Sequence, residues 1–425
     1  MVNVIRFPRP QSSQARQPRI ALSLAGGGPL GAIYEIGALC ALQEALEGID
    51  FTRLQHYVGV SAGSFIAASL ANGMSPQELC KSFIDNNGSE ADLDTLGDRF
   101  DPAWLMRLAF GEFARRAIVL PGLLASAVMR ATVGRKSLVS ALELLGPAIP
   151  TGVFSNAEVH HQMAQIFSKP GRSNDFRELQ KVRGTRLTVV ATNLDSGEAA
   201  PFGAPGWDHV PISQAIQASS ALPGLFPPVE IGDHYFVDGA LKKTLHASVA
   251  MNEGMDLVIC LNPLVPFDAL NARSTVMQRG LPKERQSIPR IVEGGLPAVL
   301  SQTFRCMIHS RLEMGMKAYE REYPQTDILL IEPDHRDPEM YLANTFSYSQ
   351  RASLAEHAYQ QTRSLLRTRR STIGSKLEKH GIMINDSVLN DPKRRLLTSA
   401  LKATAVRKAV QRLEESLDDL ELRYA

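Results

Sequence analysis

Long apolar segments are absent from this chain of 425 residues. No stretch of about 18 residues is both apolar and free of charge, as a helix that spans a bilayer has to be. Residues 1–18 contain proline, glutamine and arginine but no apolar core of the length that a secretory signal needs. We therefore expect no transmembrane helix and no secretory signal. The expected location is the cytoplasm, either in solution or in peripheral contact with a membrane.

Cysteine is scarce, and its residues lie far apart in the chain: Cys40, Cys80, Cys260 and Cys306. No pair has the spacing of a zinc site or of a disulfide framework. We therefore expect buried free thiols, no metal site and no cofactor.

An excess of one charge is also lacking, since 46 Lys and Arg residues stand against 44 Asp and Glu residues and the formal net charge is +2. General binding of nucleic acid requires a marked basic excess, so nucleic acid is not an expected partner. Hydrophobic residues make up 44% of the chain, as in ordinary globular proteins. The length suits one large α/β domain with an appendage, or two domains.

Two glycine-rich turns, by contrast, each follow a strand-like run. The first run, residues 20–25, is short and apolar and leads directly into Gly26, Gly27 and Gly28. This is the pattern of a buried strand that ends in a tight turn. Beyond Gly31 the apolar residues recur with the helical period of about 3.6 residues. The predicted unit is a strand, a glycine loop and a helix.

The same loop also satisfies a dinucleotide-binding pattern. Gly26, Gly28 and Gly31 have the GxGxxG spacing, and Asp50 follows at roughly the distance of a ribose-binding acid. A nucleotide-binding protein is therefore an alternative hypothesis. This hypothesis does not explain the second glycine-rich turn, at residues 59–63.

The second turn reads Gly59-Val60-Ser61-Ala62-Gly63 and joins a strand-like run to a helical segment. In such a GxSxG elbow the serine occupies a strained turn, where side chains two residues before and after it would collide. The turn exposes the hydroxyl near a helix N-terminus, which favours the negative charge formed when an ester carbonyl is attacked. Ser61 is the candidate nucleophile, with Gly59 and Gly63 as the elbow glycines.

An aspartate ends a later strand, where Tyr235 to Val237 lead into Asp238, Gly239 and Ala240. Acids delivered to active sites commonly lie at the carboxyl end of a strand. A free aspartate, with a pKa of about 3.9, is a weak base at neutral pH, but partial burial raises its basicity. We predict that Asp238 acts directly on the Ser61 hydroxyl as a Ser–Asp dyad.

Backbone N–H groups of the glycine loop complete the predicted site. Gly27 and Gly28 are the expected oxyanion donors, and Pro29 cannot contribute an N–H group. Loss of one such donor typically costs about 3 kcal/mol of transition-state stabilisation.

Histidine, the usual partner of a catalytic serine, is not assigned to this site, although the chain has ten. His56 precedes Ser61 on the same strand, about 16 Å back along it, and cannot reach the elbow. His246 follows Asp238 closely on an expected helix. Three further histidines, His309, His335 and His357, lie in segments without any motif, and none of them is assigned a role.

Further strand-like runs alternate with helical segments along the chain. They span Arg186–Asn193, Asp256–Asn262 and Thr326–Glu332, and a long helical region precedes the last of them. This alternation predicts a three-layer α/β/α fold in which helices flank a mainly parallel sheet.

The expected organisation is a flexible leader at 1–18, a hydrolase domain at 19–335 and a C-terminal helical extension at 336–425. A helical insertion at about 102–145 combines apolar residues with arginines, so it is either a cover of the core or a lid that touches lipid. Basic residues outnumber acids over 363–412, which is either a solvated helical surface or a face for anionic lipid.

Taken together and in this order, the motifs resemble the patatin-like phospholipase (lipid acyl hydrolase) family. The resemblance rests on the glycine loop at 26–31, the elbow at 59–63, the segment ASSALP at 218–223 with its proline-rich continuation, and Asp238-Gly239-Ala240. It covers roughly residues 19–263.

The resemblance implies a Ser61–Asp238 dyad without histidine, an oxyanion hole in the glycine loop and cleavage of fatty acyl esters without a metal. The expected activity is of the phospholipase A, lysophospholipase or lipid esterase type, and the expected partners are an acyl ester substrate and, at its periphery, an anionic membrane. Leu30 stands where the family usually has lysine or arginine, so neutral glycerides, lysolipids and other acyl esters remain open as substrates. A lipid-binding scaffold with weak catalysis is the main alternative.

Overall fold

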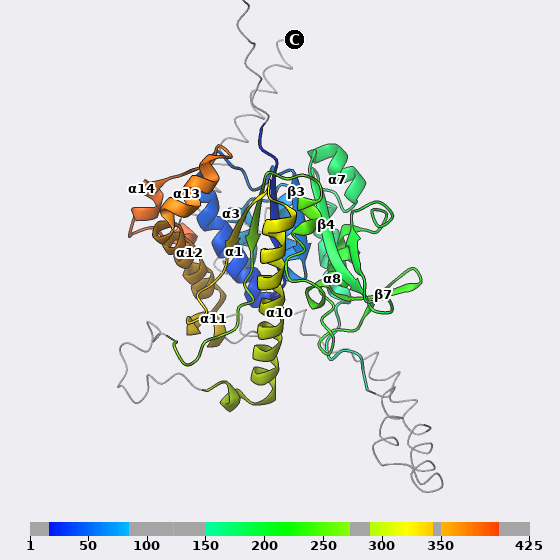
Figure 1. Cartoon of the computed structure of the whole chain (residues 1–425). Coiled ribbons are helices and arrows are strands. Elements are labelled where there is room, and N and C mark those ends of the chain that lie inside the picture. Colours follow the sequence, from blue (N-terminus) through cyan, green and yellow to red (C-terminus); the bar gives the residue numbers. More distant parts are fainter. Residues whose placement is uncertain (1–16, 85–121, 123–148, 273–289, 343–349, 399–425) are drawn as a thin grey trace, which may run out of the picture.

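The computed structural model describes residues 17–84, 122, 149–272, 290–342 and 350–398 (Figure 1). The expected leader, except for its last two residues, and the expected helical insertion, except for residue 122, lie outside these ranges. No helix in the described ranges has the length and apolarity needed to cross a membrane.

The centre of the fold is an eight-stranded sheet with the strand order β6-β7-β4-β3-β1-β8-β9, to which β5 adds by pairing with β4. Strands β4, β3, β1, β8 and β9 pair in parallel, whereas β5, β6 and β7 pair antiparallel at one side. The strands are β1 Ile20–Leu24, β3 His56–Val60, β4 Arg186–Asn193, β5 Ala199–Phe202, β6 Val229–Ile231, β7 His234–Asp238, β8 Leu257–Leu261 and β9 Asp327–Ile331.

Helices cover both faces of this sheet. On one face, α1, α2 and α8 pack against side chains such as Leu22 and Leu24. On the other, α9 and α10 pack against smaller side chains such as Ala21 and Val58. Because both faces are covered, β1, β3 and β8 are buried along their whole length, as parallel strands usually are. The predicted three-layer α/β/α fold with a mainly parallel sheet is confirmed.

The helices have the following bounds. They are α1 Gly28–Ala45, α2 Ala62–Ala71, α3 Pro76–Phe83, α6 Ala157–Phe167, α7 Phe176–Arg183, α8 Ile212–Ser219, α9 Ser248–Met251, α10 Gly295–Glu322, α11 Pro338–Leu342, α12 Arg351–Thr368, α13 Arg370–Glu378 and α14 Asp386–Asn390, with short 3₁₀ turns at Gly239–Leu241 and Ile291–Gly294. A small two-stranded sheet joins β2, Leu46–Glu47, to β10, Met383–Ile384.

The C-terminal helices share the main core. Helix α12 lies so close to α1 that a Cβ at Gly37 would be 2.4 Å from the carbonyl oxygen of Ala355. Arg363 of α12 is only 2% exposed, and its Nη2 donates to the carbonyl oxygens of Val388 and Asp391 at 2.6 and 2.8 Å. Part of the basic stretch is therefore used inside the protein, where its side chains bind backbone carbonyls.

The register brings the ends of several strands to one edge of the sheet. Leu24 of β1 pairs with Gly59 of β3 and with Leu261 of β8, so these strands end together. Every loop that follows β1, β3 and β8 starts from this edge, which is where open α/β sheets place their ligands.

Candidate active site

Ser61 occupies a sharp turn between β3 and α2. Its backbone angles, φ 52° and ψ −126°, lie in a region that non-glycine residues rarely adopt. A Cβ at Gly59 would lie 2.4 Å from the Cα of Ser64, and a Cβ at Gly63 would lie 2.5 Å from the carbonyl oxygen of Ala25. The turn can therefore close only with glycine at both positions, as the elbow pattern predicts.

A second serine holds this turn against the sheet. The N–H group of Ser61 donates to Oγ of Ser219 at 2.8 Å, and the same hydroxyl donates to the carbonyl oxygen of Val190 at 2.6 Å. Ser219 is the last residue of α8 and is fully buried. The sequence analysis includes the segment 218–223 in the family resemblance but predicts no role for Ser219. Its role follows from the fold, which brings α8 and β4 next to the elbow.

Asp238 ends β7 and is buried, with 3% of its surface exposed. Its Oδ1 accepts a hydrogen bond from the N–H group of Ala240 at 2.9 Å, and the Ser61 side chain lies near enough to this carboxylate to lower its pKa. Burial raises the pKa of Asp238 to about 6, against the lowering effect of Ala240 and Ser61. At pH 7 the group is then mostly ionised and yet more basic than a free aspartate.

β4 lies between β3, which leads to Ser61, and β7, which ends at Asp238, so the segment after β7 has to pass close to β4 to bring Asp238 to Ser61. Val60 pairs with Val190 of β4, and the next residue of β4, Ala191, pairs with Asp238. Immediately afterwards, a Cβ at Gly239 would lie 2.2 Å from the carbonyl oxygen of Val190. Gly239 is needed for this close crossing, because any side chain would keep the acid away from the elbow.

The glycine loop packs against both the elbow at Ser61 and the segment that follows Asp238. A Cβ at Gly26 would lie 3.0 Å from the Cβ of Ser61 and 3.2 Å from the Cβ of Ala240. The structure thus brings the loop, the elbow and the acid segment into contact at Gly26, although the sequence separates them widely.

Helix α1 begins directly after this loop, with Gly27 as its N-cap and Gly28 in the left-handed region at φ +59°. The first N–H groups of a helix have no partner within it and carry the positive end of its dipole. Gly27 and Gly31 pack against Pro263, whose Cγ would lie 2.8 and 3.0 Å from a Cβ at each position. Leu30 points into the apolar core and is 4% exposed.

Histidine does not join this group. His246 is buried, its Nε2 lies 3.3 Å from the carbonyl oxygen of Gly239, and burial lowers its pKa to about 4. His56 lies at the start of β3, where its Nε2 is 2.9 Å from Oγ1 of Thr188. In the described ranges no hydrogen bond links a histidine to Ser61 or Asp238.

The acid of the dinucleotide alternative lies elsewhere. Asp50 precedes β3, at the amino end of that strand, and accepts hydrogen bonds from the N–H group and Oγ1 of Thr52 at 2.8 Å. A ribose-binding acid is instead expected beyond the carboxyl end of a strand. This position argues against the nucleotide-binding hypothesis.

Comparison with known proteins gives a consistent result. A family model described as "Patatin-like phospholipase" matches residues 22–251. The chain is 20% identical over 247 residues to a protein named "Probable lipid hydrolase 463L" from Invertebrate iridescent virus 6, and the match covers 58% of this chain and 68% of that protein.

Two solved structures are similar at low identity. VipD from Legionella pneumophila matches with a TM-score of 0.34 and 17% identity, over 99% of this chain and 82% of that one. The type III effector protein ExoU, from Pseudomonas aeruginosa, matches with a TM-score of 0.30 and 16% identity, over 95% of this chain and 64% of that one.

Proposed function

This chain belongs to the patatin-like phospholipase family, which supports a lipid hydrolase activity, and on that premise we propose that it is a serine hydrolase of fatty acyl esters. The observation that carries the proposal is the placement of the Ser61 side chain beside the buried carboxylate of Asp238, near enough to lower the pKa of that carboxyl. A serine hydroxyl is a weak nucleophile unless an adjacent base accepts its proton.

In the proposed reaction, Asp238 takes the proton from Ser61 as Oγ attacks the acyl carbonyl carbon. The carbonyl oxygen becomes an oxyanion, the ester bond then breaks, and Asp238 returns the proton to the leaving alkoxide. In the second half, water gives a proton to Asp238 as it attacks the acyl-serine, and Asp238 passes this proton to Oγ of Ser61 as the bond between Oγ and the acyl carbon breaks. The fatty acid is released, and the Ser61 hydroxyl and the ionised Asp238 are restored.

The glycine loop is the proposed oxyanion hole. Gly27 and Gly28 carry N–H groups at the start of α1 and have no side chain to keep a carbonyl oxygen away. The N–H group of Ser61 is already bound to Ser219, so it is not counted among the donors. Donors fixed before the reaction are worth several kcal/mol because they need not reorganise as charge develops.

A substrate screen tests this proposal. Purified protein is incubated with phospholipids, lysophospholipids, acylglycerols and a short soluble ester, and released fatty acid is quantified with and without a fluorophosphonate. We expect hydrolysis of at least one class, and expect the fluorophosphonate to stop it. Folded protein that hydrolyses none of them and does not react with the fluorophosphonate is the result expected of a lipid-binding scaffold, and it contradicts the proposal.

The pH dependence of kcat/KM follows from Asp238, which acts as a base only when ionised. Because burial raises its pKa to about 6, activity on a soluble ester is expected to fall as the pH drops through about 6. Below that value the loss approaches about tenfold per pH unit. Initial rates between about pH 4 and 8 at low substrate concentration measure this limb. A midpoint near about 4, the value of an ordinary aspartate, contradicts the role of a buried base.

Helix α10 provides a proposed contact with lipid. Figure 1 shows its N-terminal half extending past the edge of the sheet at which β1 and β3 end. Arg311 binds the carbonyl oxygen of Leu241, close after Asp238 in the chain, so the residues of α10 before Arg311 pass beyond the candidate active site. Their exposed large apolar side chains recur at helical spacing and are Leu296, Val299, Leu300, Phe304 and Met307. Met314 is a further exposed apolar residue, beyond Arg311 on the same helix.

Charged residues in this apolar stripe are expected to weaken membrane binding. We predict that Leu300→Glu, Phe304→Glu and Met307→Glu together lower binding to vesicles containing anionic lipid by at least about tenfold, because burial of each such side chain contributes roughly 1.5–3 kcal/mol. Vesicle co-flotation measures the effect, and hydrolysis of a short soluble ester should persist.

A control adds the same charge without changing the stripe. Ser301→Glu and Lys317→Glu together also lower the net charge by three, at exposed positions of the same helix. If the control weakens binding as much as the triple variant does, the contact is electrostatic and the apolar stripe is not its cause.

A further inference from the structure

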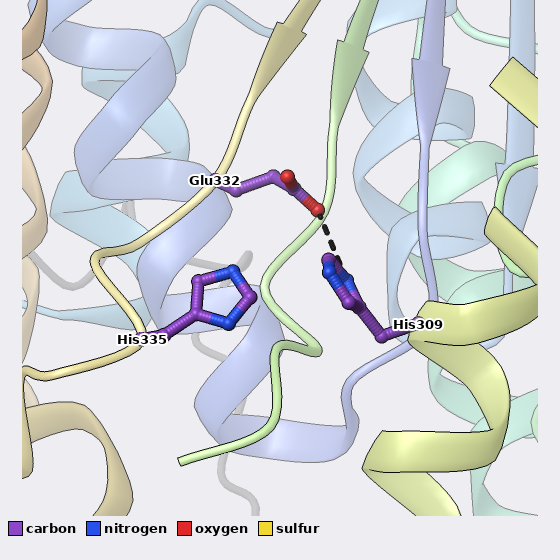
Figure 2. Close-up of side chains that lie close together, drawn as sticks. All are labelled: His309, Glu332 and His335. Carbon is purple, nitrogen blue, oxygen red and sulfur yellow. Dashed lines mark ion pairs between the residues drawn. The ribbon is translucent and has the colours of Figure 1, made fainter. Parts of the chain in front are cut away.

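Two histidines and a glutamate converge beside the candidate active site. Figure 2 shows His309 on α10 pointing toward Glu332 and His335, which lie on the segment after β9. One ligand atom from each of the three residues lies within 4.8 Å of the other two. Nδ1 of His309 is 3.7 Å from Oε1 of Glu332, and the two imidazole rings are 4.8 Å apart, nearly perpendicular.

The two ring nitrogens of His309 face different carboxylates, and Nδ1 is directed at this group. Its Nε2 lies 3.5 Å from a carboxylate oxygen of Glu313, whereas its Nδ1 is buried and has no hydrogen-bond partner. A neutral imidazole carries one N–H, and when that N–H is on Nε2, facing Glu313, Nδ1 has a free lone pair. The lone pair of Nδ1 then faces the carboxylate of Glu332, which is also an acceptor. Two facing acceptors at 3.7 Å are stabilised by a cation between them.

We propose that His309, Glu332 and His335 bind a divalent transition-metal ion, Zn²⁺ foremost. Imidazole and carboxylate are ordinary Zn²⁺ ligands, with bond lengths of about 2.0–2.2 Å. Such bonds place neighbouring ligand atoms of a tetrahedral ion about 3.3 Å apart. Small side-chain rotations bring the three ligand atoms to that spacing, and a fourth position is left for water.

Neighbouring groups hold two of the three ligands in orientation. Nδ2 of Asn262 donates to Oε1 of Glu332 at 2.7 Å, and the carboxylate of Glu313 faces the far nitrogen of His309. Metal-binding carboxylates and histidines usually have such outer partners, which fix the tautomer and the direction of the lone pair.

A second histidine–carboxylate cluster provides a contrast. His357 contacts Asp337 through Nε2 and Glu339 through Nδ1, the latter at 2.7 Å. Both ring nitrogens are therefore donors to carboxylates, and these two neighbours raise the pKa of His357 even though burial lowers it. The carboxylates around His309 are farther away, at 3.5 and 3.7 Å, and its Nδ1 has no hydrogen-bond partner.

The ion would join α10 to the end of β9, next to the glycine loop. Asn262, which binds Glu332, is followed by Pro263, and Pro263 packs against Gly27 and Gly31. The ion is not a participant in the proposed hydrolysis, since Ser61 and Asp238 are not among its ligands. Its expected effect is to stabilise the elements that support this loop, whether or not the chain is a hydrolase.

Isothermal titration of metal-free, full-length protein with ZnCl₂ tests the site. The wild type is expected to bind one equivalent of Zn²⁺, and His335→Ala and Glu332→Gln are each expected to bind it at least about tenfold more weakly. His161→Ala removes an exposed histidine of α6 and is the matched control, expected to bind as the wild type does.

Thermal melting provides a second readout on the same proteins. Zn²⁺ should raise the melting temperature of the wild type and of His161→Ala, and raise it less in the two ligand variants, because an ion stabilises only the state that binds it. Absence of Zn²⁺ binding by the wild type, or equal binding by His335→Ala and His161→Ala, overturns the proposal.

Discussion

Ser61→Ala is expected to abolish acyl-ester hydrolysis, with kcat falling by about 10³- to 10⁶-fold. The reason is that the attacking oxygen is lost with the side chain, and no other hydroxyl of the described site is placed beside the proposed base in this account. Initial rates on the best substrate of the screen measure this effect.

Ser69→Ala is the matched control for this change. Ser69 lies on α2, two turns of helix beyond Ser61, is fully buried, and its Oγ has no hydrogen-bond partner. Its replacement should leave kcat within about twofold, because a buried hydroxyl without a partner contributes little to stability. Retention of activity by folded Ser61→Ala identifies a different nucleophile.

Asp238→Asn is expected to lower kcat by about 10³-fold or more while making the protein more stable at about pH 8. Asparagine keeps the shape and can still accept the hydrogen bond of Ala240, but it cannot take the proton of Ser61. A carboxylate that only supports the fold should make the protein less stable when it is replaced. Loss of activity together with a gain in stability instead indicates a carboxylate that is kept for catalysis at a cost in stability.

The sign of the stability change follows from the pKa. Burial raises the pKa of Asp238 from 3.8 to about 6 in the folded protein, so the folded state holds its proton more tightly than the unfolded state does. The contribution of this group to stability is full below pH 3.8 and is lost as the pH rises through about 6. At about pH 8 the loss amounts to roughly 3 kcal/mol, and the Asp238→Asn variant avoids it.

Urea unfolding of the wild type and of Asp238→Asn at about pH 8 measures this difference. The variant should be more stable by up to about 3 kcal/mol, and the difference should shrink as the pH is lowered toward about 4. A variant that is less stable and retains its activity would assign the base to another group, and His246, which lies 3.3 Å from the carbonyl oxygen of Gly239, is then the histidine to examine.

Local patterns were sufficient to predict most of the central sheet. The apolar runs at 20–25, 186–193, 256–262 and 326–332 correspond to β1, β4, β8 and β9 within one residue at each end. β1 and β8 are buried along their whole length and are almost entirely apolar, and β4 and β9 contain apolar runs with a few polar residues, so all four stand out from the surrounding chain. The glycines of the elbow could also be identified from the sequence, because a tight turn excludes side chains at fixed positions.

Contacts between distant segments could not be read in the same way. Ser219 supports the elbow only because α8 lies beside β4, and nothing in its own segment indicates that hydrogen bond. Arg363 belongs to a stretch interpreted as a solvated or lipid-binding surface, yet it is buried against the carbonyls that end α14. A basic side chain is exposed by default, and only the fold shows which carbonyl oxygens are within its reach.

The histidine pair of the proposed metal site is a further example. His309 and His335 lie in segments without a motif, and their sequence context predicts no metal site. Their approach depends on α10 packing alongside the strand that follows it, so that a helix and the end of β9 face each other. Ligand sets drawn from one helix or one loop have a recognisable spacing, whereas a set assembled by packing has none.

The most direct test of the Ser61–Asp238 dyad is the site and rate of fluorophosphonate labelling, read by mass spectrometry of the digested protein. We predict a single adduct on Ser61 in the wild type, and labelling at least about 100-fold slower in folded Asp238→Asn, because the attack requires a base. An adduct on another residue, or labelling of Asp238→Asn at the wild-type rate, would contradict the dyad.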